Sequence, residues 1–92
     1  MDAKLKDFIY QNKSLFWYIP ESSLDSISQE LLLESILNYC TLDEIKKFFE
    51  IFGISNAANV FRNLKGREKL NYKPEVYNYF NLVFDRYVPR NS

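Results

Sequence analysis

The sequence predicts an all-α protein, a compact bundle of about five helices in a single domain of residues 1–92. Apolar residues recur at the three- and four-residue spacing of one helical face in several segments, and no stretch alternates with period two for long enough to form a sheet. The only two glycines, Gly53 and Gly66, each follow an apolar helical stripe, where a glycine favours the end of a helix. With 47% apolar and 26% charged residues, the composition is that of an ordinary globular domain.

The first predicted helix covers residues 3–12 and is short and amphipathic, with Asp2 available as its N-cap. The segment SLFWYIP follows, and it is too short to be assigned to a helix or a strand. Two interpretations of it stay open. Its large side chains can fill the core, or Phe16, Trp17 and Tyr18 can form an aromatic anchor for a partner protein.

The second helix is predicted to begin between Ser22 and Ser28 and to run to about Tyr39. Its apolar residues cover more than one stripe, which predicts the most buried helix of the bundle. Glu30, Glu34 and Asn38 are expected on a narrow solvent-facing edge.

A helix over residues 42–52 follows and is the first half of a helix-turn-helix-like pair. Thr41 and Glu44 have the spacing of a capping box, in which each side chain accepts a hydrogen bond from the backbone amide of the other residue. Gly53 comes directly after the apolar stripe, at the position where a positive φ is needed.

The second half of the pair is predicted over residues 56–65, with Ser55 as its N-cap and Gly66 at its end. The tight corner of a DNA-binding helix-turn-helix favours a small residue four places before the turn glycine. Here that residue is Phe49, whose bulk is expected to splay the two helices.

A charged connector, REKLNYK, leads to the last helix, and Leu70 is expected to pin this connector to the domain. Pro74 suits the first turn of the helix, because its missing amide proton costs nothing there, and Pro89 ends it. Tyr77 and Tyr79 flank the apolar face of this helix, so both are candidates for an exposed aromatic surface.

Missing residue types exclude several kinds of chemistry. The chain has no histidine, which rules out histidine-based triads, general bases and metal sites. Its single cysteine, Cys40, lacks the usual means of thiolate activation, and no glycine-rich phosphate loop is present. We therefore expect no catalytic residues, no cofactor and no metal. No apolar run is long enough to span a membrane, no secretory signal is recognisable, and a lone thiol suits the cytoplasm.

The charges are unevenly distributed, although the net charge is zero. Residues 1–55 carry five Lys and nine acidic residues, whereas residues 56–92 carry seven Lys and Arg and three acidic residues. This division is compatible with internal charge complementarity or with a basic face that binds DNA. In the second case, polar side chains on and after the second helix of the pair would contact bases and phosphates: Asn56, Asn59, Arg62, Asn63, Lys65, Arg67, Lys69 and Lys73.

Several short motifs are shared with a known group of proteins: KSLFW at 13–17, Leu24-Asp25, SILNY at 35–39, TLDE at 41–44, Phe52-Gly53, and Leu70 with Tyr79-Phe80. In these motifs the chain resembles a family of small, uncharacterised bacterial helical proteins. Members of that family are commonly encoded beside nucleotidyltransferase toxins of the abortive-infection type, so the resemblance implies an antitoxin-like role and supplies no catalytic residue. The leading hypothesis is a non-enzymatic protein that binds a protein partner through Phe16, Trp17 and Tyr18 or through Tyr77 and Tyr79. The alternative is a sequence-specific DNA-binding regulator.

Overall fold

A computed structural model of the chain describes residues 2–89, which form six α-helices and two 3-10 helices and no β-strand. The predicted all-α class is confirmed, and five of the helices have seven residues or more. In chain order the helices are α1 (Ala3–Gln11), η1 (Lys13–Phe16), η2 (Glu21–Ser26), α2 (Gln29–Tyr39), α3 (Leu42–Phe52), α4 (Ile54–Arg62), α5 (Gly66–Lys69) and α6 (Pro74–Tyr87), where η marks a 3-10 helix.

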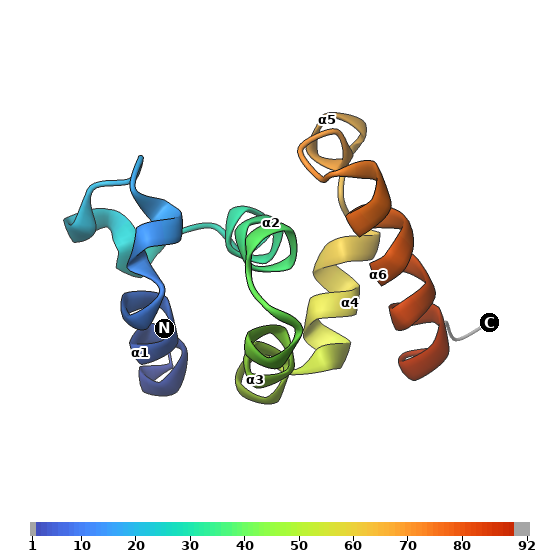
Figure 1. The fold of residues 1–92 in the computed structure, drawn as a ribbon, viewed down its shortest axis with the longest axis horizontal. Helices are drawn as coiled ribbons and strands as arrows, with labels where there is room; N and C mark the ends of the chain where they lie inside the picture. Colours follow the sequence, from blue (N-terminus) through green and yellow to red (C-terminus); the bar gives the residue numbers. More distant parts are fainter. Residues whose placement is uncertain (1, 90–92) are drawn as a thin grey trace.

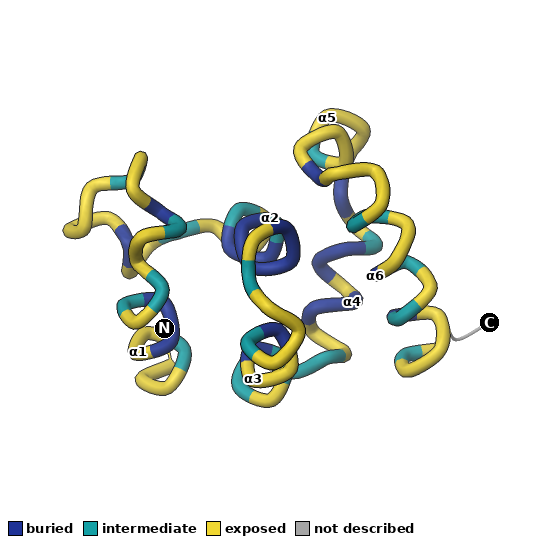
Figure 2. The backbone as a smooth tube through the Cα atoms, in the orientation of Figure 1, coloured by how far each residue is buried: buried dark blue, intermediate teal, exposed yellow. Residues whose placement is uncertain are grey.

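Helix α4 lies between α3 and α6 in the bundle (Figure 1). It packs against α2 and α3, while α1 contacts α3 on the opposite side of that pair. Ala57 and Ala58 are fully buried, and their small side chains let neighbouring helices approach the α4 backbone closely. Helix α6 covers the remaining side, where Phe61 packs against Phe84 with the ring centroids 5.1 Å apart. Burial is accordingly concentrated on α2 and α4 and is sparse on α6 (Figure 2).

The start of α3 agrees with the sequence prediction. The Glu44 amide donates to the Thr41 hydroxyl at 3.2 Å, and the Thr41 amide donates to the Glu44 carboxylate at 3.0 Å. The capping box is therefore confirmed, and so are the bounds of the helix.

The corner between α3 and α4 is tighter than predicted. Gly53 has the expected positive φ, 91°, and it serves as both the C-cap of α3 and the N-cap of α4. Its amide donates to the Phe49 carbonyl at 2.9 Å, and its carbonyl accepts from the Ala57 amide at 2.9 Å. The prediction that Ser55 caps α4 is wrong, because the helix has already begun at Ile54.

The end of α4 also differs from the prediction. The helix stops at Arg62, with Asn63 as its C-cap, and does not continue to residue 65. Leu64 then turns back into the core and is buried. Gly66 does not end α4. It is the first residue of α5 and has no positive φ, so the predicted connector contains a helical turn of its own.

The predictions for Leu70 and Asn38 are also wrong. Leu70 does not pin the connector, since it is 83% exposed; Tyr72 is the buried residue there. Asn38 is buried rather than solvent-facing. Its amide donates to the Asn71 carbonyl at 3.2 Å, and its side-chain oxygen accepts from the Lys73 amide at 3.2 Å, so it ties α2 to the chain before α6.

The second predicted helix is split into two elements. Residues 21–26 form η2, and α2 begins only after Ser28, whose hydroxyl accepts from the Leu31 amide at 3.2 Å. Ser28 is thus the N-cap, at the late end of the predicted range. The bounds of α6, with Pro74 in its first turn, agree with the prediction.

Candidate functional site

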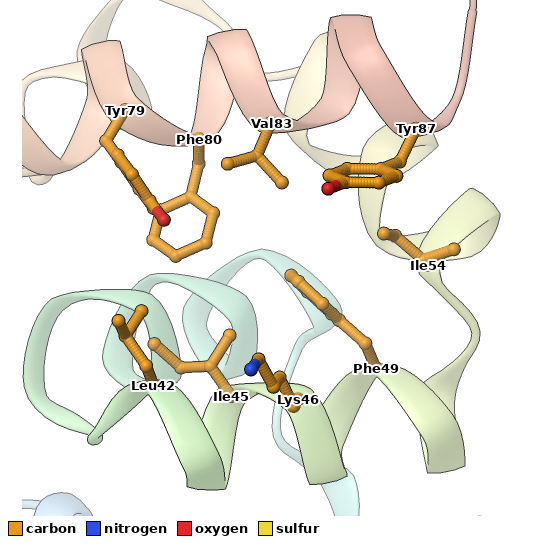
Figure 3. A pocket seen from close by; sticks show the side chains of 9 residues that line it. All are labelled: Leu42, Ile45, Lys46, Phe49, Ile54, Tyr79, Phe80, Val83 and Tyr87. Atoms are coloured by element: carbon orange, nitrogen blue, oxygen red, sulfur yellow. The ribbon is translucent and has the colours of Figure 1, made fainter.

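An apolar groove runs between α3 and α6 and encloses about 380 Å³. In Figure 3 the α6 side chains point down toward those of α3, and Ile54 at the start of α4 closes one end. We call this site the α3–α6 groove. Nine side chains line it: Leu42, Ile45, Lys46, Phe49, Ile54, Tyr79, Phe80, Val83 and Tyr87.

Phe49 forms part of the groove and does not obstruct the α3–α4 corner. Its ring lies 5.7 Å from the Phe84 ring and 6.2 Å from the Phe80 ring, so it projects from α3 toward α6. The ring therefore packs against α6, and α3 and α4 contact each other on either side of Gly53. Its aromatic surface connects the core to the groove.

The rim of the groove exposes unusually large side chains. Tyr79 is 50% exposed and Tyr87 is 65% exposed, and Leu42 and Leu82 are exposed beside them. Lys46 is the one charged side chain in the lining, and it makes no salt bridge with any residue that the structure describes. The groove therefore presents apolar surface with a single positive charge.

A second surface extends along α2 from Leu31 to Tyr39, and we call it the aromatic cleft. It is an open hollow of about 740 Å³ between the η1 segment, α2 and the chain before α6. It is lined by Ser14, Leu15, Trp17, Tyr18, Leu31, Glu34, Tyr39 and Asn71.

The aromatic segment divides between core and surface. The prediction that Phe16 contacts a partner is wrong, because its side chain is buried in the core. Trp17, in contrast, is 83% exposed. A 3-10 helix has three residues per turn, so consecutive side chains point in very different directions. The core interpretation therefore holds for Phe16, whereas the exposed Trp17 stays a candidate partner contact.

Tyr77 and Tyr79 were both predicted to contact a partner, but they lie in different surroundings on α6. The Tyr77 ring stacks on Phe61 with the centroids 4.9 Å apart and is only partly exposed, so it contributes to the packing of α6 on α4. Tyr79 faces the α3–α6 groove (Figure 3). Leu42 and Tyr87, which also line the groove, were missing from the predicted partner contacts. For Tyr87 the available signal was the four-residue spacing of Tyr79, Val83 and Tyr87, which places them on one helical face.

The predicted DNA contacts do not form one free surface. Arg62 is the clearest case, because its side chain is only 17% exposed. One guanidinium nitrogen, Nη2, donates to the Val88 carbonyl at 2.6 Å, the Phe84 carbonyl at 3.1 Å and the Asp85 carboxylate at 3.4 Å. Arg62 therefore caps the C-terminal end of α6, where carbonyl groups lack helical partners.

The other candidate DNA contacts are exposed: Asn56, Asn59, Asn63, Lys65, Arg67, Lys69 and Lys73. The Asn63 side chain, however, donates to the Asn59 carbonyl at 2.7 Å and to its side-chain oxygen at 3.2 Å. The α4 helix also packs against α2, α3 and α6. Its exposed face is a narrow stripe of asparagines and does not project from the domain.

The single thiol of the chain, Cys40, is partly buried at the C-cap of α2. Burial, with a smaller contribution from Glu44, raises the pKa of the Cys40 thiol from 9.0 to about 11, which keeps it protonated at neutral pH. Among residues 2–89 no group of three or more Cys, Asp or Glu side chains is placed to hold a metal ion. None of the described helices is long and apolar enough to cross a membrane.

Comparison with known proteins identifies no relative: no protein-family model matches the chain, and neither a curated protein sequence nor a solved structure matches it at a significant level.

Proposed function

We propose that this protein is a non-enzymatic, cytoplasmic, helical interaction protein that binds a protein partner through the α3–α6 groove. The observation that carries the proposal is the set of large apolar side chains that two helices leave exposed along one groove, with Tyr79 and Tyr87 at its rim. Contiguous apolar surface on a small domain marks an interaction site, and tyrosine is enriched among residues that contribute most to binding.

The shape of the groove favours a helical ligand. Its two walls are helices, and α3 has 11 residues, which corresponds to a length of about 16 Å. This length matches three turns of a bound helix, whose apolar side chains at i, i+4 and i+7 would enter the groove. Lys46 would pair with an acidic side chain at the edge of that apolar stripe. We therefore assign the occupant as an amphipathic helix of the partner that carries an acidic residue beside its apolar face.

The family resemblance supplies a candidate for the partner. An antitoxin-like protein encoded beside a nucleotidyltransferase toxin would bind that toxin directly, a role that needs no catalytic residue of its own. The exposed apolar groove is compatible with such a role, and the protein encoded next to this chain is the first partner to test.

The test is co-purification of the tagged protein with its neighbouring gene product, followed by titration calorimetry. We expect the double variant Tyr79→Ala/Tyr87→Ala to weaken binding at least 30-fold, because removing a central aromatic contact commonly costs about 2 kcal/mol or more. Tyr79 is 50% exposed and Tyr87 is 65% exposed, so the variant should keep its helical circular dichroism.

The matched control is Leu70→Ala, which removes an apolar side chain that is 83% exposed and lies outside the groove. Its affinity should stay within twofold of the wild type. Unchanged binding by the Tyr79/Tyr87 variant would overturn the assignment of the groove. Sedimentation showing a dimer that the same variant dissociates would identify a second copy of this chain as the occupant and would equally refute the proposal.

A DNA-binding role is the competing proposal, supported by the exposed cationic side chains of Lys65, Arg67 and Lys69 beside α4. The placement of Arg62 under α6 and the Asn59–Asn63 hydrogen bonds speak against base contacts by α4. A mobility-shift assay on the upstream DNA at two salt concentrations decides between the roles. Binding that weakens steeply with salt is expected for DNA contacts, and no shift at low salt would eliminate them.

A further inference from the structure

The aromatic cleft combines exposed aromatic rings with one carboxylate, whereas the one charged side chain in the α3–α6 groove is the cation of Lys46. Trp17, Tyr18 and Tyr39 contribute the rings, and Glu34 contributes the carboxylate. Aromatic faces carry partial negative charge, so rings grouped beside a carboxylate attract cations and not anions.

The rings at the η1 end are held in a defined arrangement. Trp17 and Tyr18 meet edge to face, with their centroids 5.7 Å apart and their planes at 82°. The Tyr18 hydroxyl lies 3.4 Å from the hydroxyl of Ser35, which is buried on α2. Trp17 remains 83% exposed, so its indole ring is open to a ligand.

Tyr39 already makes a contact of the relevant kind within the protein. The ammonium group of Lys73 lies over its ring, 4.9 Å from the centroid. Lys13, which precedes the cleft residue Ser14 in the sequence, forms a salt bridge with Glu21 at 3.5 Å. The Trp17 and Tyr18 rings have no cation over them among the described residues.

Glu34 provides a negative charge that the protein does not neutralise. None of the salt bridges in residues 2–89 includes this carboxylate. Burial raises its pKa, hydrogen bonding to Asn71 opposes the shift, and the nearby Glu68 raises it further. A cation brought into the cleft would therefore relieve an unfavourable charged state.

We propose that the aromatic cleft binds an arginine side chain of a protein partner, with the guanidinium group stacked on Trp17 and hydrogen-bonded to Glu34. Arginine fits better than lysine, because its planar group can stack on an indole and donate to a carboxylate at the same time. Its methylene groups would lie along Leu15 and Leu31. This inference adds a second contact to the proposed function. It rests on that function in one respect, namely that the partner is a protein.

Trp17 is the only tryptophan in the chain, so its fluorescence reports directly on the cleft. The probe is a short glycine- and serine-rich peptide with two arginines, titrated into the full-length protein and compared with peptides that carry citrulline or lysine instead. Citrulline keeps the shape of arginine and removes its charge. We expect a saturable change in Trp17 emission with the arginine peptide, at least tenfold weaker binding of the citrulline peptide, and weaker binding of the lysine peptide.

Two variants with the same change in net charge test the role of the carboxylate. Glu34→Gln should weaken binding of the arginine peptide about tenfold, which is the scale of one charge-assisted hydrogen bond. Glu30→Gln, one turn earlier on α2 and outside the cleft, should stay within twofold. Amide chemical shifts should change around residues 15–18 and 31–39.

Equal binding of the arginine and citrulline peptides, or equal effects of the two variants, would overturn the proposal. Equal binding of arginine and lysine would overturn the assignment to arginine. The titration uses neither the partner nor the α3–α6 groove. A negative result here therefore leaves the proposed function intact, and failure of the co-purification leaves this titration interpretable.

Discussion

Replacing Arg62 tests how much one side chain adds to the packing that holds the end of α6 on the bundle. The guanidinium group of Arg62 donates to two main-chain carbonyls near the end of α6, Val88 at 2.6 Å and Phe84 at 3.1 Å. Hydrogen bonds that involve a charged group contribute about 1.5–3 kcal/mol each. Water can reach these carbonyls once the side chain is truncated, so the lower value is appropriate and the two bonds together contribute about 3 kcal/mol.

The remaining interactions of Arg62 change this figure little. The salt bridge with Asp85, which is half exposed, is of the kind that contributes about 1 kcal/mol at most. The Nε atom of Arg62 is buried without a hydrogen-bond partner among the described residues, a cost that the variant removes. We therefore keep the estimate for Arg62→Ala at about 3 kcal/mol, a large share of the 5–14 kcal/mol expected roughly for a domain of this size.

The assay is urea denaturation followed by far-ultraviolet circular dichroism. With a denaturant dependence of about 1.5 kcal/mol per molar, the midpoint of Arg62→Ala should fall by about 2 M. Arg67→Ala is the control, since that arginine is exposed, and its stability should change by less than about 0.5 kcal/mol. If the two variants have the same stability, Arg62 does not hold α6 and its guanidinium group is free for other contacts.

Three further predictions concern single positions. Gly53→Ala should lower the free energy of unfolding by about 1–3 kcal/mol, because a residue with a side chain is strained at φ 91°, although the added Cβ would meet only Asn56 at 3.7 Å. Gly66→Ala should be neutral or slightly stabilising in the same denaturation assay. Tyr72→Phe should raise the free energy of unfolding by about 1 kcal/mol, because the Tyr72 hydroxyl is buried without a hydrogen-bond partner among the described residues. Cys40 should react slowly with thiol reagents at pH 8 in the native protein. Since the unfolded thiol loses its proton near pH 9 and the folded thiol only near 11, stability should fall as the pH rises between these values, and Cys40→Ala should lessen this decrease.

The features that the sequence predicted correctly are encoded within a few consecutive residues. The capping box of α3 needs only Thr41 and Glu44, three positions apart, and the stop at Gly53 needs only a glycine after an apolar stripe. The all-α class follows from the same local periodicity. Pro74 marked the start of α6 for an equally local reason, since the ring is tolerated in the first turn.

The features that the sequence missed depend on residues far apart in the chain. Arg62 has the type and spacing of a base-contacting residue, but its partners lie 22 to 26 positions later. Asn38 resembles a solvent-facing residue of an amphipathic helix, yet it bonds to main-chain atoms 33 and 35 positions away. No local pattern distinguishes such a buried polar contact from an exposed one, because the distinction arises only when α4 packs against α6 and α2 against the connector.

Both the stability of the bundle and its proposed binding surface depend on α6. A helix that packs on one side buries a single stripe, and α6 carries aromatic residues over a wider arc than α3 and α4 cover. Phe80 and Phe84 are therefore buried, whereas Tyr79 and Tyr87 remain exposed on the α3–α6 groove. Because Arg62 holds the end of α6 near Tyr87, its loss would change the width of the groove as well as the stability. A loss of partner binding in Arg62→Ala would thus not distinguish a direct contact from a displaced helix, and only the exposed tyrosines, which can be changed without releasing α6, allow the groove to be assigned as the binding site.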